Sequence, residues 1–187
     1  MRDVALRFNK ATLADAIVKS KAELSVEGDT LEAKAAVVAK DLHNQLFHME
    51  TSGVLLNMVN DVKLSPVDPK FREGVATVLT KLPEFNIRNT SVYTVLQDPK
   101  LLEEVAEDLR QSVVSELKSL QRVQAISPVP EVVPVLMKAN MTSAFRVTEM
   151  PEKAFVQNFS ASFGEGKAGE NIAMQVYHQA TNTRIRV

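Results

Sequence analysis

The chain has 187 residues, of which 45% are apolar and 24% charged, so it is long enough to bury a core in one large domain or two small ones. A formal net charge of −1 provides no overall field for nucleic acid or anionic lipid, so we do not expect polyanionic partners. The absence of cysteine excludes disulfides, thiolate zinc sites and thiol nucleophiles.

Apolar runs are short throughout the sequence. Residues 1–25 lack the continuous apolar run of a signal peptide, and no stretch approaches the roughly 18 apolar residues of a membrane span. We therefore expect that the chain neither crosses a membrane by itself nor carries its own secretion signal.

The segment from Asp29 to Glu50 has the clearest helical period. Asp29, followed three residues later by Glu32, resembles a capping box, and Gly53 is the predicted stop. Apolar residues recur at intervals of three and four, which predicts one buried stripe. The stripe consists of Leu31, Ala35, Val38, Leu42, Leu46 and Met49.

A second long helix is predicted to begin at Asp98 and Pro99, because a capping residue there precedes proline at the first helical position. It has room for about seven turns before Ser127 and Pro128 end it. Its predicted stripe consists of Leu102, Ala106, Leu109, Val113, Leu117 and Leu120.

Shorter helices fill most of the remaining sequence. Strand signals are scarce, because Val4 to Phe8 alternate over too few residues to support a sheet. The sequence therefore predicts an all-α fold, an irregular multi-helix bundle that ends in a helical hairpin, with a loose division near residues 60–68. The shorter helices are predicted at 69–82, 91–97, 131–139, 143–149, 152–162 and 167–182.

Residues 164–169 read Gly-Glu-Gly-Lys-Ala-Gly, which has the G-x-G-x-x-G spacing of dinucleotide-binding turns. Such a turn needs a buried strand before it and an acidic residue about 20 positions after it. Phe155, Phe159 and Phe163 instead recur every four residues, which predicts a helix before the glycines. We therefore expect no nucleotide cofactor, and interpret Gly164 as a left-handed residue that ends this helix and Gly166 as freeing the turn.

An alternative interpretation of the same turn is a helix-hairpin-helix module for nucleic acid. In that case Gly164, Gly166 and Lys167 would contact one phosphate at the start of the last helix. Against it, Glu165 occupies a position that is normally apolar in such modules, and Glu170 lies in the same first turn.

Other candidate sites have weaker patterns. His43 and His48 are five residues apart, so they diverge around a helix and cannot share a metal; we interpret both as solvent or boundary residues. His178 has no identifiable partner. An acidic group at the start of a helix is interpreted as a solvated face that offsets the helix dipole; it contains Glu103, Glu104, Glu107 and Asp108. The sequence thus indicates no catalytic residue and no metal site.

Several blocks follow one another in the second part of the chain. They are Pro83–Ser91 (PEFNIRNTS), Leu117–Val123 (LKSLQRV), Ser143–Pro151 (SAFRVTEMP), Phe155 and Val176–Ala180 (VYHQA). Together they resemble a helical segment of large bacterial proteins related to the A subunit of insecticidal toxin complexes. The resemblance covers about residues 68–185, and in those relatives a glycine turn lies between the last two helices.

This resemblance implies a non-catalytic structural and interaction module of a secreted, oligomeric toxin-like protein, with other domains or subunits as partners. It divides the chain into residues 1–67, an N-terminal helical region without a match, and residues 68–187, the toxin-complex-A-like module. It also implies a secreted or cell-surface location within a larger protein. The receptor-binding and channel-forming parts of that family are absent from this chain.

The residues of these blocks have a structural interpretation of their own. Phe155, Phe159 and Tyr177 are expected to form, with neighbouring apolar residues, the core of the terminal hairpin. Arg122 lies off the apolar stripe of its helix, and we expect it to bond carbonyl groups of that helix's own last turn.

Overall fold

The computed structural model describes residues 1–186, and in that part of the chain every regular element is a helix. The all-α prediction is confirmed. The helices are α1 (Arg2–Arg7), α2 (Lys10–Ser20), α3 (Leu31–Met49), α4 (Thr51–Asn60), α5 (Arg72–Thr80), α6 (Val92–Val95), the 3-10 helix η1 (Pro99–Leu102), α7 (Glu107–Ala125), α8 (Val132–Lys138), α9 (Ala144–Glu149), α10 (Glu152–Phe163) and α11 (Gly166–Ile185). None of them is long and apolar enough to cross a membrane.

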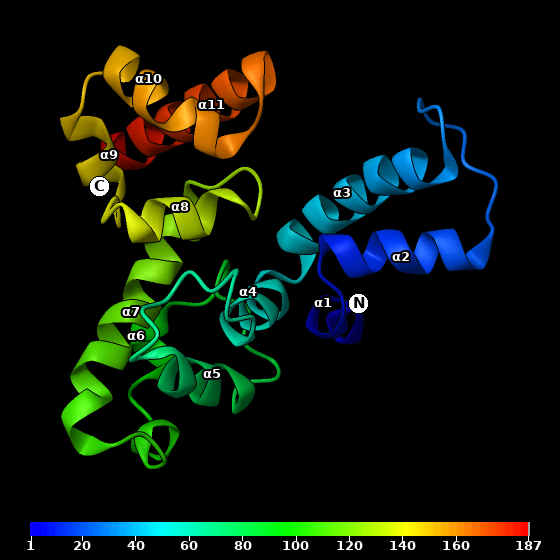
Figure 1. The fold of residues 1–187 in the computed structure, drawn as a ribbon. Coiled ribbons are helices and arrows are strands. Elements are labelled where there is room, and N and C mark those ends of the chain that lie inside the picture. The colour runs from blue at the N-terminus through cyan, green and yellow to red at the C-terminus, as the bar shows by residue number, and fades with distance from the viewer. Residues whose placement is uncertain (187) are drawn as a thin grey trace.

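The helices form a bundle with one projecting arm (Figure 1). The arm is the antiparallel pair α2 and α3, on the right of the view, and α4 connects it to the rest by packing against α1, α3 and α5. Helix α7 packs against α5, α6 and α8, while α9, α10 and α11 form a cap at the other end of the bundle. The C-terminal end of α11 lies beside α9.

The first long helix is confirmed, but its ends and its buried face differ from the prediction. Thr30, and not Asp29, caps α3 by accepting a hydrogen bond from the amide of Ala33 at 3.1 Å. Leu42 and Met49 are exposed, because the contacts of α2 and α4 select a different face of α3. That buried face consists of Ala35, Ala39, His43, Leu46 and Phe47.

Gly53 does not end this helix. The break comes earlier, at Glu50, whose φ of −130° lies outside the helical range. Gly53 lies inside α4 and is buried against Ala5 of α1. Helix α4 is buried on nearly all sides, so a glycine here serves close helix packing.

The second long helix is divided in two. Asp98 caps a single 3-10 turn at Pro99 by accepting a hydrogen bond from the amide of Lys100 at 3.0 Å, and α7 begins only at Glu107. With 19 residues, α7 has about five turns, and not the predicted seven. The predicted stripe holds within it, since Val113, Leu117 and Leu120 are all buried.

The six shorter helices predicted after residue 68 are present as α5, α6 and α8 to α11, whereas α1, α2 and α4 were not predicted. Helix α6 is capped by Ser91, whose side chain accepts a hydrogen bond from the amide of Tyr93. Val4, Ala5 and Leu6, part of the short alternating run, lie in α1. Core residues come from both sides of residues 60–68, for example Phe47 and Leu55 before them and Leu117 and Phe155 after them; the proposed domain division stays a prediction.

The terminal hairpin has an aromatic core. Phe155 is fully buried, and its ring centroid lies 4.7 Å from that of Phe159, 6.4 Å from that of Phe163 and 5.8 Å from that of Tyr177. Such tilted ring pairs stabilise beyond their buried area. The hairpin and its aromatic packing are therefore as the sequence predicts.

We expect Phe155→Ala to lower the free energy of unfolding by about 3 kcal/mol or more, because the lost ring leaves a cavity. Chemical denaturation measures the change. Phe145→Ala is the matched control, since Phe145 is 54% exposed and its loss opens no cavity. A loss below about 1 kcal/mol for Phe155→Ala would show that the hairpin core does not depend on this ring.

Candidate functional site

The glycine turn between α10 and α11 is built differently from the prediction. Gly164 has φ 163° and ψ 177°, which is extended backbone and not the left-handed region. Gly166, with φ 51°, is the residue that takes the left-handed conformation. A Cβ at Gly169 would collide with the carbonyl oxygens of Ser160 and Gly164, so this glycine lets the two helices touch. The turn therefore serves the close packing of α10 against α11.

The predicted anion-contact residues surround this turn. Lys167 and Gly166 are exposed in the first turn of α11, and Gly164 is half-buried. Glu165 and Glu170, also exposed, place negative charge beside Lys167. The phosphate interpretation of Gly164, Gly166 and Lys167 stays a prediction.

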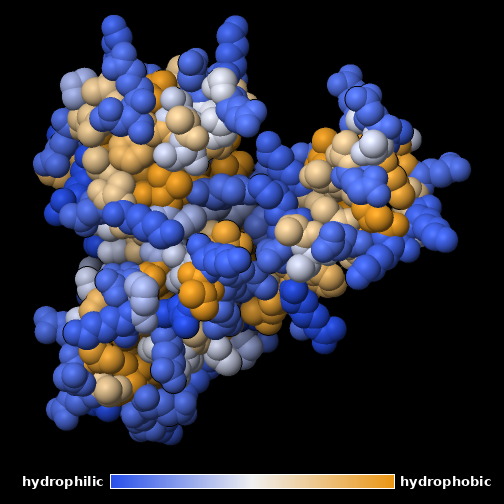
Figure 2. Space-filling model, in the orientation of Figure 1, coloured by the Kyte–Doolittle hydropathy of each residue, from blue (hydrophilic) through white to orange (hydrophobic). Residues whose placement is uncertain are grey.

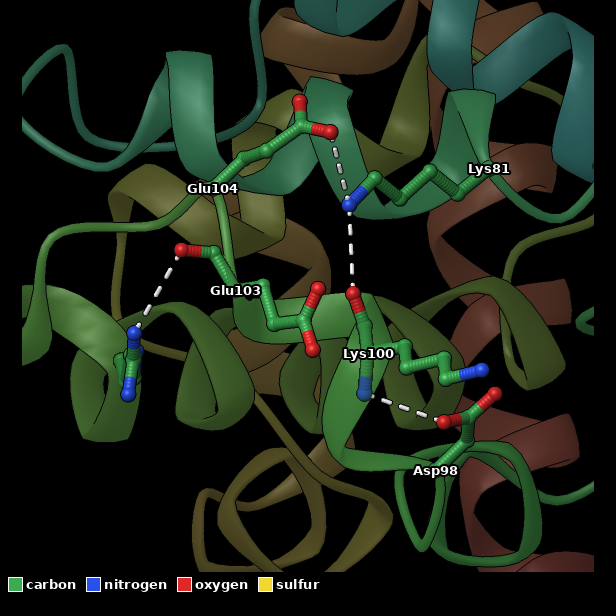
Figure 3. Close-up of polar contacts among 6 residues, drawn as sticks. Lys81, Asp98, Lys100, Glu103 and Glu104 are labelled. Carbon is green, nitrogen blue, oxygen red and sulfur yellow. Dashed lines mark hydrogen bonds and ion pairs between the residues drawn. The ribbon is translucent and has the colours of Figure 1, made fainter.

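The acidic group near residue 105 belongs to the break between η1 and α7. Glu107 and Asp108 lie in the first turn of α7, where negative charge is favourable. Glu104 forms an ion pair with Lys81 at 3.0 Å, and the same ammonium group donates to the carbonyl oxygen of Lys100 at 3.2 Å (Figure 3). Within residues 1–186, no group of three or more histidine or acidic side chains is arranged to hold a metal ion.

A second polar cluster joins two of the blocks named above. The side-chain amide of Gln121 on α7 donates to the carbonyl oxygens of Ile87 at 2.9 Å and Thr90 at 2.7 Å. Its oxygen accepts from the amide of Val92 at 3.0 Å. One side chain thus satisfies two carbonyl groups of the irregular segment before α6 and the amide of the first residue of α6. We call this arrangement the Gln121 clamp.

Arg122 does not bond its own last turn. Its Nε donates to the carbonyl oxygen of Thr142 at 3.2 Å, and its Nη2 donates to Ser119 Oγ at 3.2 Å. The residue therefore connects the end of α7 to the segment before α9. The prediction was wrong because a nearer residue bonds the end of α7. The hydroxyl of Ser127 donates to the carbonyl oxygen of Val123 at 2.7 Å.

Tyr177 makes a similar contact within the cap. Its hydroxyl donates to the carbonyl oxygen of Met150 at 3.0 Å, while its ring packs on Phe155. His178 also has a partner that the sequence did not reveal, since its Nε2 lies 3.2 Å from Glu152 Oε1. Both contacts hold α11 against the start of α10.

His43 differs from the predicted boundary residue. It is only 6% exposed, and its Nδ1 has no hydrogen-bond partner in the described structure. Burial lowers the pKa of its imidazole, because the low-dielectric surroundings disfavour the charged form. His48, in contrast, is exposed and its Nε2 lies 2.9 Å from the carbonyl oxygen of Pro128.

The His43 ring lines a cavity of about 350 Å³ between the arm and α8. The cavity surface is mostly apolar. Lys10 and Glu131, which also line it, form an ion pair at 3.1 Å between α2 and the start of α8. In chemical terms the cavity contains an imidazole whose pKa is lowered by burial, with one basic and one acidic side chain, Lys10 and Glu131, also lining it.

Sequence reasoning missed the Gln121 clamp, the buried His43 and the packing role of Gly169. Gln121 lies in the same block as Arg122. The sequence analysis therefore identified the block, but it singled out the arginine and not the glutamine that bonds the neighbouring segment. A periodic pattern alone does not show whether a histidine beside an apolar stripe is buried or lies at the boundary with solvent. Gly169 belongs to the glycine string, but only tertiary contact shows which glycine meets the other helix.

No match is found when the chain is compared with protein-family models, with curated proteins and with solved structures.

The buried imidazole predicts a pH dependence of stability. The folded-state pKa of His43 lies below its ordinary value of 6.5, so below about pH 6.5 the unfolded chain binds more protons than the folded one. The free energy of unfolding should therefore fall as the pH decreases from 6.5 towards the folded-state pKa, by up to about 1.4 kcal/mol per pH unit. Chemical denaturation at several pH values measures the slope.

Two variants isolate the contribution of His43. His43→Gln should lose this part of the slope, while His178→Gln, at an exposed position, should keep it. Burial and Asp68 raise the pKa of the Glu116 carboxyl, which stabilises the fold in acid, but this effect is common to all three proteins. Equal slopes in wild type and His43→Gln would contradict the prediction.

Proposed function

We propose that the chain is a non-catalytic structural and interaction module, built of helices, in a secreted multidomain protein related to the A subunits of toxin complexes. Its partners in this proposal are other domains or subunits of one large assembly. The sequence blocks that carry the resemblance provide the support, through what their side chains do in the fold.

One observation carries the proposal. The blocks are joined to one another, or to the segment next to them, by bonds from side chain to backbone. Gln121 connects the second block to the first, Arg122 connects it to Thr142 directly before the third, and Tyr177 connects the last to Met150. These side chains are engaged in fixing the positions of helices, as expected of a scaffold.

The surface offers positions that other domains could cover. Met1, Val4, Leu42 and Met49 are exposed and line one apolar groove of about 190 Å³. Figure 2 shows hydrophobic side chains on the arm at the right of the view, among polar ones. Exposed apolar groups that gather at one place are typical of contact surfaces between domains or proteins.

The intact polypeptide in its source organism tests the proposal. An antibody raised against this chain should detect, in the culture supernatant, a polypeptide several times larger than the 20.7 kDa of residues 1–187. Mass spectrometry of the captured band should find peptides of this chain together with flanking sequence. A free polypeptide of about 20.7 kDa confined to the cell interior would contradict the proposal.

A DNA-binding measurement tests the helix-hairpin-helix alternative. This alternative predicts tight binding to duplex DNA that weakens steeply with salt and is lost in Lys167→Glu. Lys153→Glu, at an exposed position on α10, is the matched control for the change in charge. Binding of this kind would replace the scaffold proposal.

A further inference from the structure

A second apolar groove lies where the ends of α7 and α11 meet the start of α9. It has a volume of about 460 Å³, and its surface is mostly apolar. Among its lining residues are Ala125, Ala144 and Phe145, together with the arginines Arg122 and Arg184. Gln121, whose side chain forms the clamp described above, also lines the groove.

The groove is lined by one exposed aromatic ring, that of Phe145. Phe145 is 54% exposed, although most phenylalanines of the cap are buried or half-buried. The guanidinium group of Arg184 lies 5.1 Å from the centroid of the Phe145 ring, a cation–π contact that holds the ring in place. An ordered, exposed aromatic side chain is a preferred anchor in protein interfaces.

The two arginines are oriented by neutral atoms alone. Arg122 donates to the Thr142 carbonyl and to Ser119, and Arg184 Nη1 donates to Thr148 Oγ1 at 3.1 Å. No ion pair within residues 1–186 includes an arginine. Each guanidinium group therefore keeps N–H donors for a further acceptor, and carboxylates match that planar group best.

The two charged residues that line the groove, Arg122 and Arg184, are both basic. On α9, Arg146 and Glu149 are both exposed. An occupant of this surface should therefore combine apolar side chains for the groove with carboxylates for its rim.

We propose that this groove binds an acidic amphipathic helix of a partner protein. Apolar residues of the helix would pack on Phe145 and Ala144, and its carboxylates would pair with Arg122 and Arg184. A helix suits the site because its residues at intervals of three and four present apolar and charged groups on adjacent faces. The inference rests on the proposed role of the chain in protein interaction and names the chemistry of the partner.

Fluorescence anisotropy with two labelled peptides tests this surface. Both peptides have about 16 residues and one face of leucines, and they differ only in carrying glutamates or lysines on the other faces. The acidic peptide should bind at least about tenfold more tightly than the basic one, and its affinity should fall as salt is raised. Binding at similar strength by both peptides, or no binding of the acidic peptide up to about 1 mM, would overturn the proposal.

Variants locate the binding to the groove. Phe145→Ser, Arg184→Glu and the double variant Arg122→Glu/Arg184→Glu should each weaken acidic-peptide binding about tenfold or more. The double variant Arg7→Glu/Lys19→Glu changes the net charge by the same amount at exposed positions on α1 and α2, and should bind like wild type. Phe145→Ser and Arg184→Glu leave the Arg122 bonds intact, so they remain informative if the double groove variant unfolds.

Equal effects of the groove and control variants would show that only net charge matters and would overturn the proposal. Sedimentation velocity adds a further outcome, because a dimer of this chain that Phe145→Ser abolishes would make a second copy the occupant in place of a partner protein. These results do not depend on the size or location of the native polypeptide, so failure here is distinguishable from failure of the proposed function.

Discussion

The fold depends on satisfying backbone polar groups at the breaks between its short helices. Each helix end leaves amide and carbonyl groups without partners inside the helix, and burying them unpaired is unfavourable. In this protein, some partners are adjacent capping residues such as Thr30 and Asp98, and others are side chains from other helices. Gln121 binds the segment before α6, Asn57 donates to the Leu6 carbonyl at 2.7 Å, and Ser52 accepts from the Ile87 amide at 2.8 Å. With no disulfide available, these contacts and the apolar core fix the connections.

Most of the helices could be predicted from the sequence, because period and capping are local properties, but α1, α2 and α4 were not. The aromatic spacing of α10 also predicted the hairpin, since Phe155 and its neighbours lie on one face. Local patterns failed for features that are decided by contacts between segments distant in the sequence. Asp98 and Pro99 start a helical turn, but Arg110 bonds the Val105 carbonyl at 3.0 Å and stabilises the break that follows it. Candidate site residues were harder to predict, because a partner far away in sequence decides whether Arg122 caps its own helix or binds Thr142.

The interior and the surface have different roles in this account. Half-buried polar residues such as Gln121 and Tyr177 bond backbone groups of neighbouring segments and hold the helices in position. The surface keeps groups available for a partner, chiefly the arginines beside Phe145, which form no ion pair within residues 1–186, and the apolar residues of the arm. This organisation supports the proposal of an interaction module, in which a helical frame presents contact surfaces. The buried His43 adds a dependence on pH, because its environment favours the neutral imidazole.

Amide hydrogen exchange at Val92 tests most directly the claim that Gln121 holds the irregular segment. In wild type, the Val92 amide should be protected by its bond to Gln121. In Gln121→Leu, exchange at Val92 should accelerate and the free energy of unfolding should fall by about 2 kcal/mol or more, because partly buried backbone groups lose their partners. Gln111→Leu, at an exposed position on the same helix, should change neither. Unchanged protection of Val92 in Gln121→Leu would contradict the account.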